Sequence, residues 1–108
     1  MAWLLKDDKV LAHIEVADGF RSRLKGLIGR GELEGAILIR PAKSVHTVGV
    51  RFAIDVAYCN RDLIVLDTLT MQPMRLGRWR RKAHAVVEAR AGAFERWGLE
   101  AGDALEIR

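Results

Sequence analysis

The sequence predicts a small, mainly β (α+β) fold: a β-sandwich or open barrel of about eight short strands, with one packed helix near residues 20–28. Short apolar runs separated by turn residues recur along the chain, whereas helical spacing of apolar residues occurs in one segment. The length of 108 residues, half of them hydrophobic, suits a single domain spanning residues 1–108. Because such a domain buries a modest core, we expect no deep substrate cavity.

The first predicted elements are the two strands of a hairpin. Residues 2–6 form the first strand, Asp7 and Asp8 the turn, and residues 10–16 the second strand. Apolar residues alternate from Val10 to Val16, which places His13 on the opposite face of the strand. We therefore expect the His13 side chain to be solvated.

A helix is predicted next, over residues 20–28. Phe20, Leu24, Leu27 and Ile28 recur at the spacing of one helix face. Asp18 is a suitable N-cap, since its carboxylate can accept hydrogen bonds from the free amides of the first turn. Glycines directly after the helix provide its end.

The rest of the chain is predicted to be mostly strands. Their expected positions are Ala36–Ile39, Ser44–Val48, Phe52–Cys59, Leu63–Leu69, His84–Arg90 and Ala104–Arg108. A last short helix or turn is expected over Gly92–Trp97. Cys59 is the single cysteine, so it cannot form an intrachain disulfide, and its apolar neighbours predict a core thiol.

Positive charge is concentrated in one segment. Within eight residues that contain no acid lie Arg75, Arg78, Arg80, Arg81 and Lys82. The net charge is +4, yet without these five residues 13 basic side chains face 14 acidic ones. The basic character of the protein is therefore a property of this segment.

Trp79 lies among these cations. Arginines neutralise phosphates and an exposed indole stacks on a base, so the pattern suits a surface that binds an anionic partner such as nucleic acid. The alternative is a solvated hairpin in which Trp79 folds back against the sheet. No recognised nucleic-acid motif accompanies the segment.

A second candidate site lies in the middle of the chain. The stretch between Glu34 and Asp55 contains no acid and four basic side chains: Arg40, Lys43, His46 and Arg51. If the fold brings His46, Arg51 and Asp55 together, they form an anion-binding or proton-transfer pocket. The alternative is an ion pair or turn hydrogen bond between Asp55 and Arg51 that pins a strand end.

Glu88 joins this candidate pocket because it is a carboxylate in the middle of an apolar strand. Buried acids are seldom left without a partner. The expected partner is an arginine, with Arg21, Arg23 and Arg51 as candidates, and structural bracing is the favoured role.

Other chemistries are not supported. The three histidines, at positions 13, 46 and 84, lack the short spacing that metal ligands favour, so no metal site is expected. Neither serine lies in a nucleophile elbow, and the glycines follow the predicted helix instead of preceding it, which argues against a nucleotide loop. We expect no cofactor. Without a signal peptide or membrane-spanning run, we expect a cytoplasmic protein with no membrane partner.

Four stretches resemble a known family of small bacterial and archaeal proteins. These are RSRLKGLIGR at residues 21–30, HTVGVRFAIDV at 46–56, AVVEARAG at 85–92, and Gly102 with Asp103. The first is similar to the arginine and glycine-leucine helix motif of domain of unknown function 192, and the second to its central strand pair. The resemblance implies a mainly β fold of sandwich type with one packed helix, and no activity. Many relatives carry a leader peptide, but we do not expect one in this protein.

Two functional hypotheses follow. The first is a non-enzymatic binding module that presents residues 75–82 to an anionic partner, with nucleic acid as an example. The second is an enzyme or small-anion site around His46, Arg51, Asp55 and Glu88. Convergence of these four side chains on one cavity would favour the second hypothesis.

Overall fold

The computed structural model describes residues 2–17 and 33–108, which form one β-rich domain. Its elements are β1 (Ala2–Lys6), β2 (Lys9–Ala17), β3 (Ala36–Ile39), β4 (Ile54–Cys59), β5 (Val65–Met71), β6 (Ala85–Arg90), α2 (Ala93–Trp97) and β7 (Leu105–Ile107). The strands form one seven-stranded sheet in the order β5-β4-β6-β3-β2-β1-β7. The pair β2 and β3 is parallel and the other pairs are antiparallel, so the predicted mainly β fold is confirmed.

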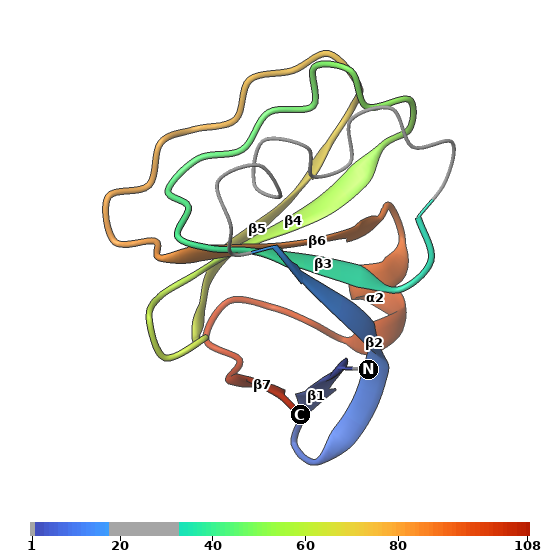
Figure 1. Cartoon of the computed structure of the whole chain (residues 1–108), viewed down its shortest axis with the longest axis vertical. Helices are drawn as coiled ribbons and strands as arrows, with labels where there is room; N and C mark the ends of the chain where they lie inside the picture. Colours follow the sequence, from blue (N-terminus) through green and yellow to red (C-terminus); the bar gives the residue numbers. More distant parts are fainter. Residues whose placement is uncertain (1, 18–32) are drawn as a thin grey trace.

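The sheet curls into a half-barrel (Figure 1). Its two outermost strands come close where β5 begins and β7 begins, at an isolated bridge between Ile64 and Ala104. The amide of Leu105 donates to the carbonyl of Leu63 at 3.0 Å, and that of Val65 to Asp103 at 2.8 Å. These bonds partly satisfy edges that would otherwise be open to pairing with another chain.

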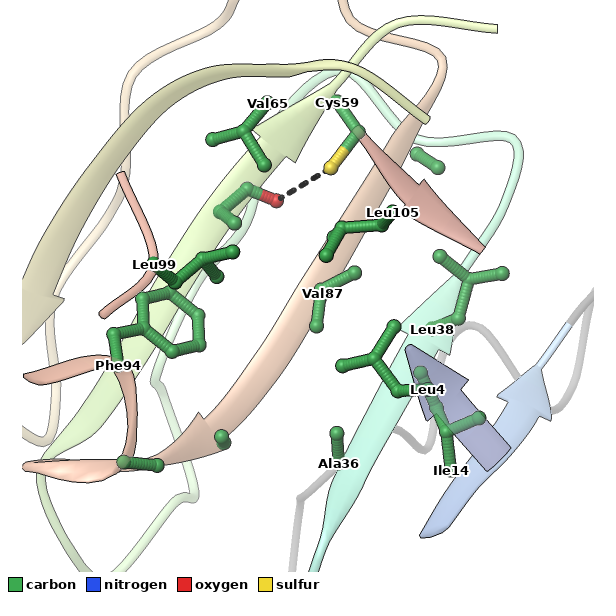
Figure 2. Close-up of a cluster of buried hydrophobic side chains, with 14 residues drawn as sticks. Leu4, Ile14, Ala36, Leu38, Cys59, Val65, Val87, Phe94, Leu99 and Leu105 are labelled. Carbon is green, nitrogen blue, oxygen red and sulfur yellow. Dashed lines mark hydrogen bonds between the residues drawn. The ribbon is translucent and has the colours of Figure 1, made fainter. Parts of the chain in front are cut away.

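Apolar side chains cover both faces of the central strands. One cluster lies between the curled sheet and α2, and Figure 2 shows Leu4, Leu38, Val87 and Phe94 pointing into it. On the opposite face, Ile37, Ile54, Val56, Tyr58 and Val86 form a second cluster with residues of the loop before β4. Strand β6 is buried on both faces because the first cluster covers one face and the second cluster covers the other, which explains its nearly continuous apolar sequence.

The short helix α2 confirms the prediction of a helix or turn over residues 92–97. Gly92 and Gly98 flank it with φ angles of 98° and 64°, in the left-handed region that favours glycine. Phe94 packs against Trp97 with ring centroids 5.6 Å apart, and both belong to or border the first core cluster.

Two details differ from expectation in the first hairpin. Strand β1 pairs Leu4 with Ala12 but Leu5 with Val10, so Leu11 is an extra residue that breaks the alternation. His13 is half-buried instead of solvated, with its ring edge-on to the Trp3 indole at 6.2 Å.

The strand predicted over Ser44–Val48 is wrong. In this segment a single ladder bridge occurs, between His46 and Leu76, because the backbone groups of residues 43–47 bond the β5–β6 connection at irregular spacing. The buried Cys59 thiol is confirmed as a core group, and burial raises its pKa to about 12. The helix predicted over residues 20–28 lies outside the described residues. Among those described, no helix is long and apolar enough to cross a membrane.

Candidate anion-binding surface

The basic segment (residues 75–82) lies in the long connection between β5 and β6. Figure 1 shows this connection running beside the loop that joins β3 to β4. The two loops are joined through their backbones: Thr47 donates its amide to the Arg75 carbonyl at 2.8 Å, and the Gly77 amide donates to Val45 at 2.7 Å. Because the backbone of the basic segment is hydrogen-bonded to the β3–β4 loop, most of its side chains extend into the solvent.

Thr47 fixes the start of the basic segment. Its fully buried hydroxyl donates to the carbonyl of Gln72 at 2.6 Å and accepts from the amide of Arg75 at 2.8 Å. Sequence reasoning missed this residue, because a threonine in a loop is usually solvated and no nearby pattern marks it.

Gly77 allows the two loops to approach. A Cβ atom at this position would lie 2.6 Å from the Val45 carbonyl oxygen and 3.0 Å from the Tyr58 hydroxyl. Both distances are shorter than ordinary van der Waals contact, so a larger residue would push the basic segment away from the sheet.

The cations of the basic segment are mostly free of acidic partners. Arg75, Arg78, Arg81 and Lys82 are exposed, and within the described chain no ion pair involves them. Arg80 is the exception: its guanidinium lies 3.4 Å from Asp67 and over the ring of Tyr58 at 5.9 Å. The predicted concentration of charge is therefore presented on the surface of the molecule.

Trp79 does not fold back against the sheet. Its side chain is 63% exposed, and its neighbours Met74 and Leu76 are 63% and 82% exposed. The basic segment thus exposes apolar surface among its cations. Exposed apolar residues that lie together among polar side chains mark interaction surfaces more often than single exposed apolar residues do.

A hollow of about 270 Å³ opens next to the basic segment. It is lined by Tyr58, Asp67, Leu69, Arg78 and Arg80. Burial raises the pKa of the Tyr58 hydroxyl, which stays protonated and donates to the Arg78 carbonyl at 2.9 Å. This hydrogen bond holds the Tyr58 side chain in place in the lining of the hollow, which also includes two arginines.

The four residues of the second candidate pocket do not form one site. His46 and Arg51 are exposed, whereas Asp55 and Glu88 are buried, at 4% and 3% exposure. In the register of β4 and β6, Val56 lies opposite Glu88 and Asp55 lies opposite Ala89. Since neighbouring positions in a strand point to opposite faces, the two carboxyl groups lie on different sides of the sheet.

Asp55 binds backbone amides instead of Arg51. One carboxylate oxygen accepts from the Thr70 hydroxyl at 2.8 Å, and the other from the amides of Gly92 and Phe94 at 3.0 and 3.1 Å. It therefore caps α2 from the neighbouring strand β4, a task that Gly92 at the N-cap position cannot perform with a side chain. A hydrogen bond does pin this strand end, but Arg51 is not the partner.

Glu88 lies between Ile37 of β3 and Val56 of β4 on the face of the second core cluster. Burial raises the pKa of its carboxyl group to about 7. No hydrogen bond or ion pair joins it to another residue in the part of the chain that the structure describes. Arg51 is exposed, and the other two proposed partners, Arg21 and Arg23, lie outside that part.

Metal ligands do not gather in the structure. Within residues 2–17 and 33–108, no group of three histidine, cysteine, aspartate or glutamate side chains is placed to hold an ion.

Solved structures of other proteins share this fold. A protein of unknown function from Novosphingobium aromaticivorans DSM 12444 superposes with a TM-score of 0.81 and 19% identity, over 97% of this chain and 82% of that one. A protein from Sinorhizobium meliloti 1021 superposes with a TM-score of 0.82 and 19% identity, over 97% of this chain and 90% of its own. At this identity the likeness concerns the fold.

Sequence comparison assigns the family. UPF0127 protein PF1050 of Pyrococcus furiosus is 32% identical over 106 residues, covering 94% of this chain and 91% of the relative. The family model DUF192, described as "Uncharacterized ACR, COG1430", matches residues 3–107. Because these matches span nearly the whole chain, the protein belongs to the DUF192 family.

Proposed function

We propose that the protein is a binding module for an anionic polymer, with single-stranded nucleic acid as its preferred partner, and that the basic segment is the binding surface. The observation that carries the proposal is the exposure of four cations around an exposed indole, with no acidic partner for them among residues 2–17 and 33–108. Phosphates bind such cations with release of counterions, and a base stacks on the indole.

The ordered backbone of the basic segment supports this proposal. Its amides bond Val45 at 2.7 Å and Lys43 at 2.7 Å, so little of the backbone has to be ordered on binding. Lys43 extends the positive surface, with its ammonium group donating to the carbonyls of Arg81 and Ala83. The hollow beside Arg78 and Arg80 gives an unstacked base or sugar a place next to the cations.

The alternative enzyme or small-anion site around His46, Arg51, Asp55 and Glu88 has less support. Its two carboxyl groups lie on different faces of the sheet, and Asp55 is already engaged by three donors. A cytoplasmic location belongs to the binding proposal, since that compartment holds single-stranded nucleic acid.

Salt dependence tests the electrostatic part. If four cations contact phosphates of a fluorescent thymidine oligonucleotide, log affinity against log salt concentration has a slope of about −2.8, and of about −3.6 for duplex DNA. Replacing Arg75, Arg78 and Arg81 together by glutamine reduces the slope with the oligonucleotide to about −0.7. Fluorescence anisotropy at several salt concentrations measures both.

A matched control removes exposed cations elsewhere. Lys9 and Arg61 are exposed and lie outside the basic segment, so replacing both by glutamine leaves the slope nearly unchanged. The proposal fails if the wild-type protein binds neither the oligonucleotide nor heparin at low salt, or if the control reduces the slope as much as the triple variant does.

Trp79→Ala tests the stacking part. We expect it to weaken oligonucleotide binding by about 1–3 kcal/mol without changing the salt slope, because it removes a stacking surface and no charge. The urea midpoint stays the same, since the indole is 63% exposed. An unchanged affinity contradicts stacking by Trp79, and a large loss of stability contradicts its exposed position.

A further inference from the structure

Strand β5 is the outermost strand at one end of the sheet, beside β4 (Figure 1). The first residue of β5 is covered on the outer side: the Val65 amide donates to the Asp103 carbonyl at 2.8 Å, and the Val65 carbonyl accepts from the Gly102 amide at 2.7 Å. The rest of the strand, with the sequence LDTLTM, contains neither lysine nor proline, the residues that commonly protect a sheet edge. An unprotected edge is a template for pairing with another chain.

The hydrogen bonds of β4 show which backbone groups of β5 are free. The Cys59 carbonyl accepts from the His84 amide at 2.8 Å, on the side of β4 where β6 lies. Because successive residues of a strand turn their backbone groups to alternate edges, the residues two and four positions before Cys59 also face β6. Their partners in β5 are Thr68 and Thr70, whose amides and carbonyls therefore point away from the sheet. Among the residues that the structure describes, no backbone group bonds them.

A hollow borders this free edge on the face of the sheet that carries α2. Its volume is about 330 Å³, and its lining includes Thr68, Thr70 and Glu95. Glu95 is exposed, and within the described chain no ion pair involves it. Asp55 also lines this hollow, with its oxygens engaged by three donors. The hollow therefore suits a cationic side chain.

The hollow of about 270 Å³ beside the basic segment borders the same edge on the opposite face. Leu69 lines both hollows, because β5 separates them. The charged residues of this second hollow are Arg78, Arg80 and Asp67. Arg80 lies 3.4 Å from Asp67, whereas Arg78 has no ion-pair partner in the described part of the chain. This hollow therefore suits an acidic side chain.

We propose that β5 binds an extended segment of a partner protein as an additional antiparallel strand, and that this segment alternates cationic and acidic side chains. Its backbone exchanges hydrogen bonds with Thr68 and Thr70, where the free groups lie. The partner residues opposite these two threonines are cationic and reach Glu95, because directly opposed residues share a face of the sheet. The residue between them lies opposite Leu69, is acidic, and reaches Arg78 on the other face.

The charge pattern favours such a segment over a second copy of this chain. An antiparallel pairing of two β5 strands about Leu69 would place Thr68 opposite Thr70 and turn the same face of both sheets to one side. Both copies would then bring Glu95 to that face with threonines opposite it instead of cations. The proposal also does not depend on nucleic-acid binding, since the free backbone groups belong to β5 and not to the basic segment.

The test uses two short peptides that differ in charge pattern. The probe is acetyl-Thr-Lys-Glu-Lys-Thr-amide, which places its lysines opposite Thr68 and Thr70 and its glutamate opposite Leu69. The control is acetyl-Thr-Glu-Lys-Glu-Thr-amide. Because so short a contact binds weakly, each is titrated into isotope-labelled protein and followed by NMR. We expect saturable shifts at the amides of Thr68 and Thr70, with the probe binding at least fivefold tighter. The net charge of +4 on the protein favours the control, so this preference reports the local pattern.

Changes to the backbone and to one charge separate the two parts of the proposal. N-methylation of both lysine amides of the probe removes the donors that face Thr68 and Thr70, so we expect binding to be lost. Thr68→Pro removes an amide that points to solvent, which edge strands tolerate, so the urea midpoint is retained while probe binding weakens at least tenfold. Glu95→Gln removes most of the preference for the probe, whereas Glu34→Gln, at an exposed acid before β3, retains it.

The proposal is overturned if the probe does not saturate, if the control or the N-methylated probe binds as tightly, or if the shifts map away from β5. These outcomes need the wild-type protein alone, so they decide the matter even if Thr68→Pro does not fold. Self-association of the wild-type protein that Thr68→Pro abolishes would identify a second copy as the occupant and would also overturn it.

Discussion

Replacing Asp55 by alanine is expected to lower the free energy of unfolding by about 3–5 kcal/mol, because two backbone amides and a hydroxyl lose their shared acceptor. The amide of Phe94 is buried, so water cannot replace the carboxylate there at low cost. The urea midpoint measures the loss. Hydrogen exchange locates it, with faster exchange expected at the amides of Gly92 and Phe94.

Two milder variants separate the contributions. Thr70→Val keeps the shape of the side chain and removes one hydrogen-bond donor, so we expect the free energy of unfolding to fall by about 1 kcal/mol. Asp55→Asn keeps one acceptor oxygen, so we expect its loss in free energy of unfolding to lie between those of Thr70→Val and Asp55→Ala. If Asp55→Ala leaves the urea midpoint unchanged, Asp55 does not hold α2 in place, and its burial needs another explanation.

The role of Asp55 shows how far sequence reasoning reaches in this fold. Alternating apolar residues and turn signals located most strands, and Ala36–Ile39 was predicted with the bounds the structure has. Register, in contrast, is set by pairing between strands distant in sequence. The sequence does not contain this register, so the carboxylates of β4 and β6 were expected in one pocket. In the structure Glu88 lies opposite Val56, one residue away from Asp55, and the two carboxylates therefore lie on opposite faces of the sheet.

The basic segment was easier to find than the residues that position it. Charge density is a property of nearby letters, so Arg75 to Lys82 stood out directly. The supports of the segment, such as Thr47 and Gly77, act through loop contacts across about thirty residues of sequence. No local pattern distinguishes a threonine that bonds a distant backbone from one that faces solvent.

Glu88→Gln is expected to stabilise the protein at neutral and higher pH by up to about 3 kcal/mol. Burial raises the pKa of Glu88 from 4.5 to about 7, and each unit of such a difference corresponds to about 1.4 kcal/mol. Between these two pH values the unfolded chain releases the Glu88 proton while the folded chain keeps it. Stability therefore falls as pH rises from 4.5 to 7 and levels off above the folded pKa.

The difference between wild type and variant isolates this group. Histidines and other carboxylates titrate in both proteins, so their contributions cancel when the free energies of unfolding are subtracted at each pH. We expect the advantage of Glu88→Gln to grow between pH 4.5 and 7. A flat difference over this range would mean that the Glu88 carboxylate is ionised in the folded protein. In that case a cation stabilises it, and Arg21→Gln and Arg23→Gln would identify which one.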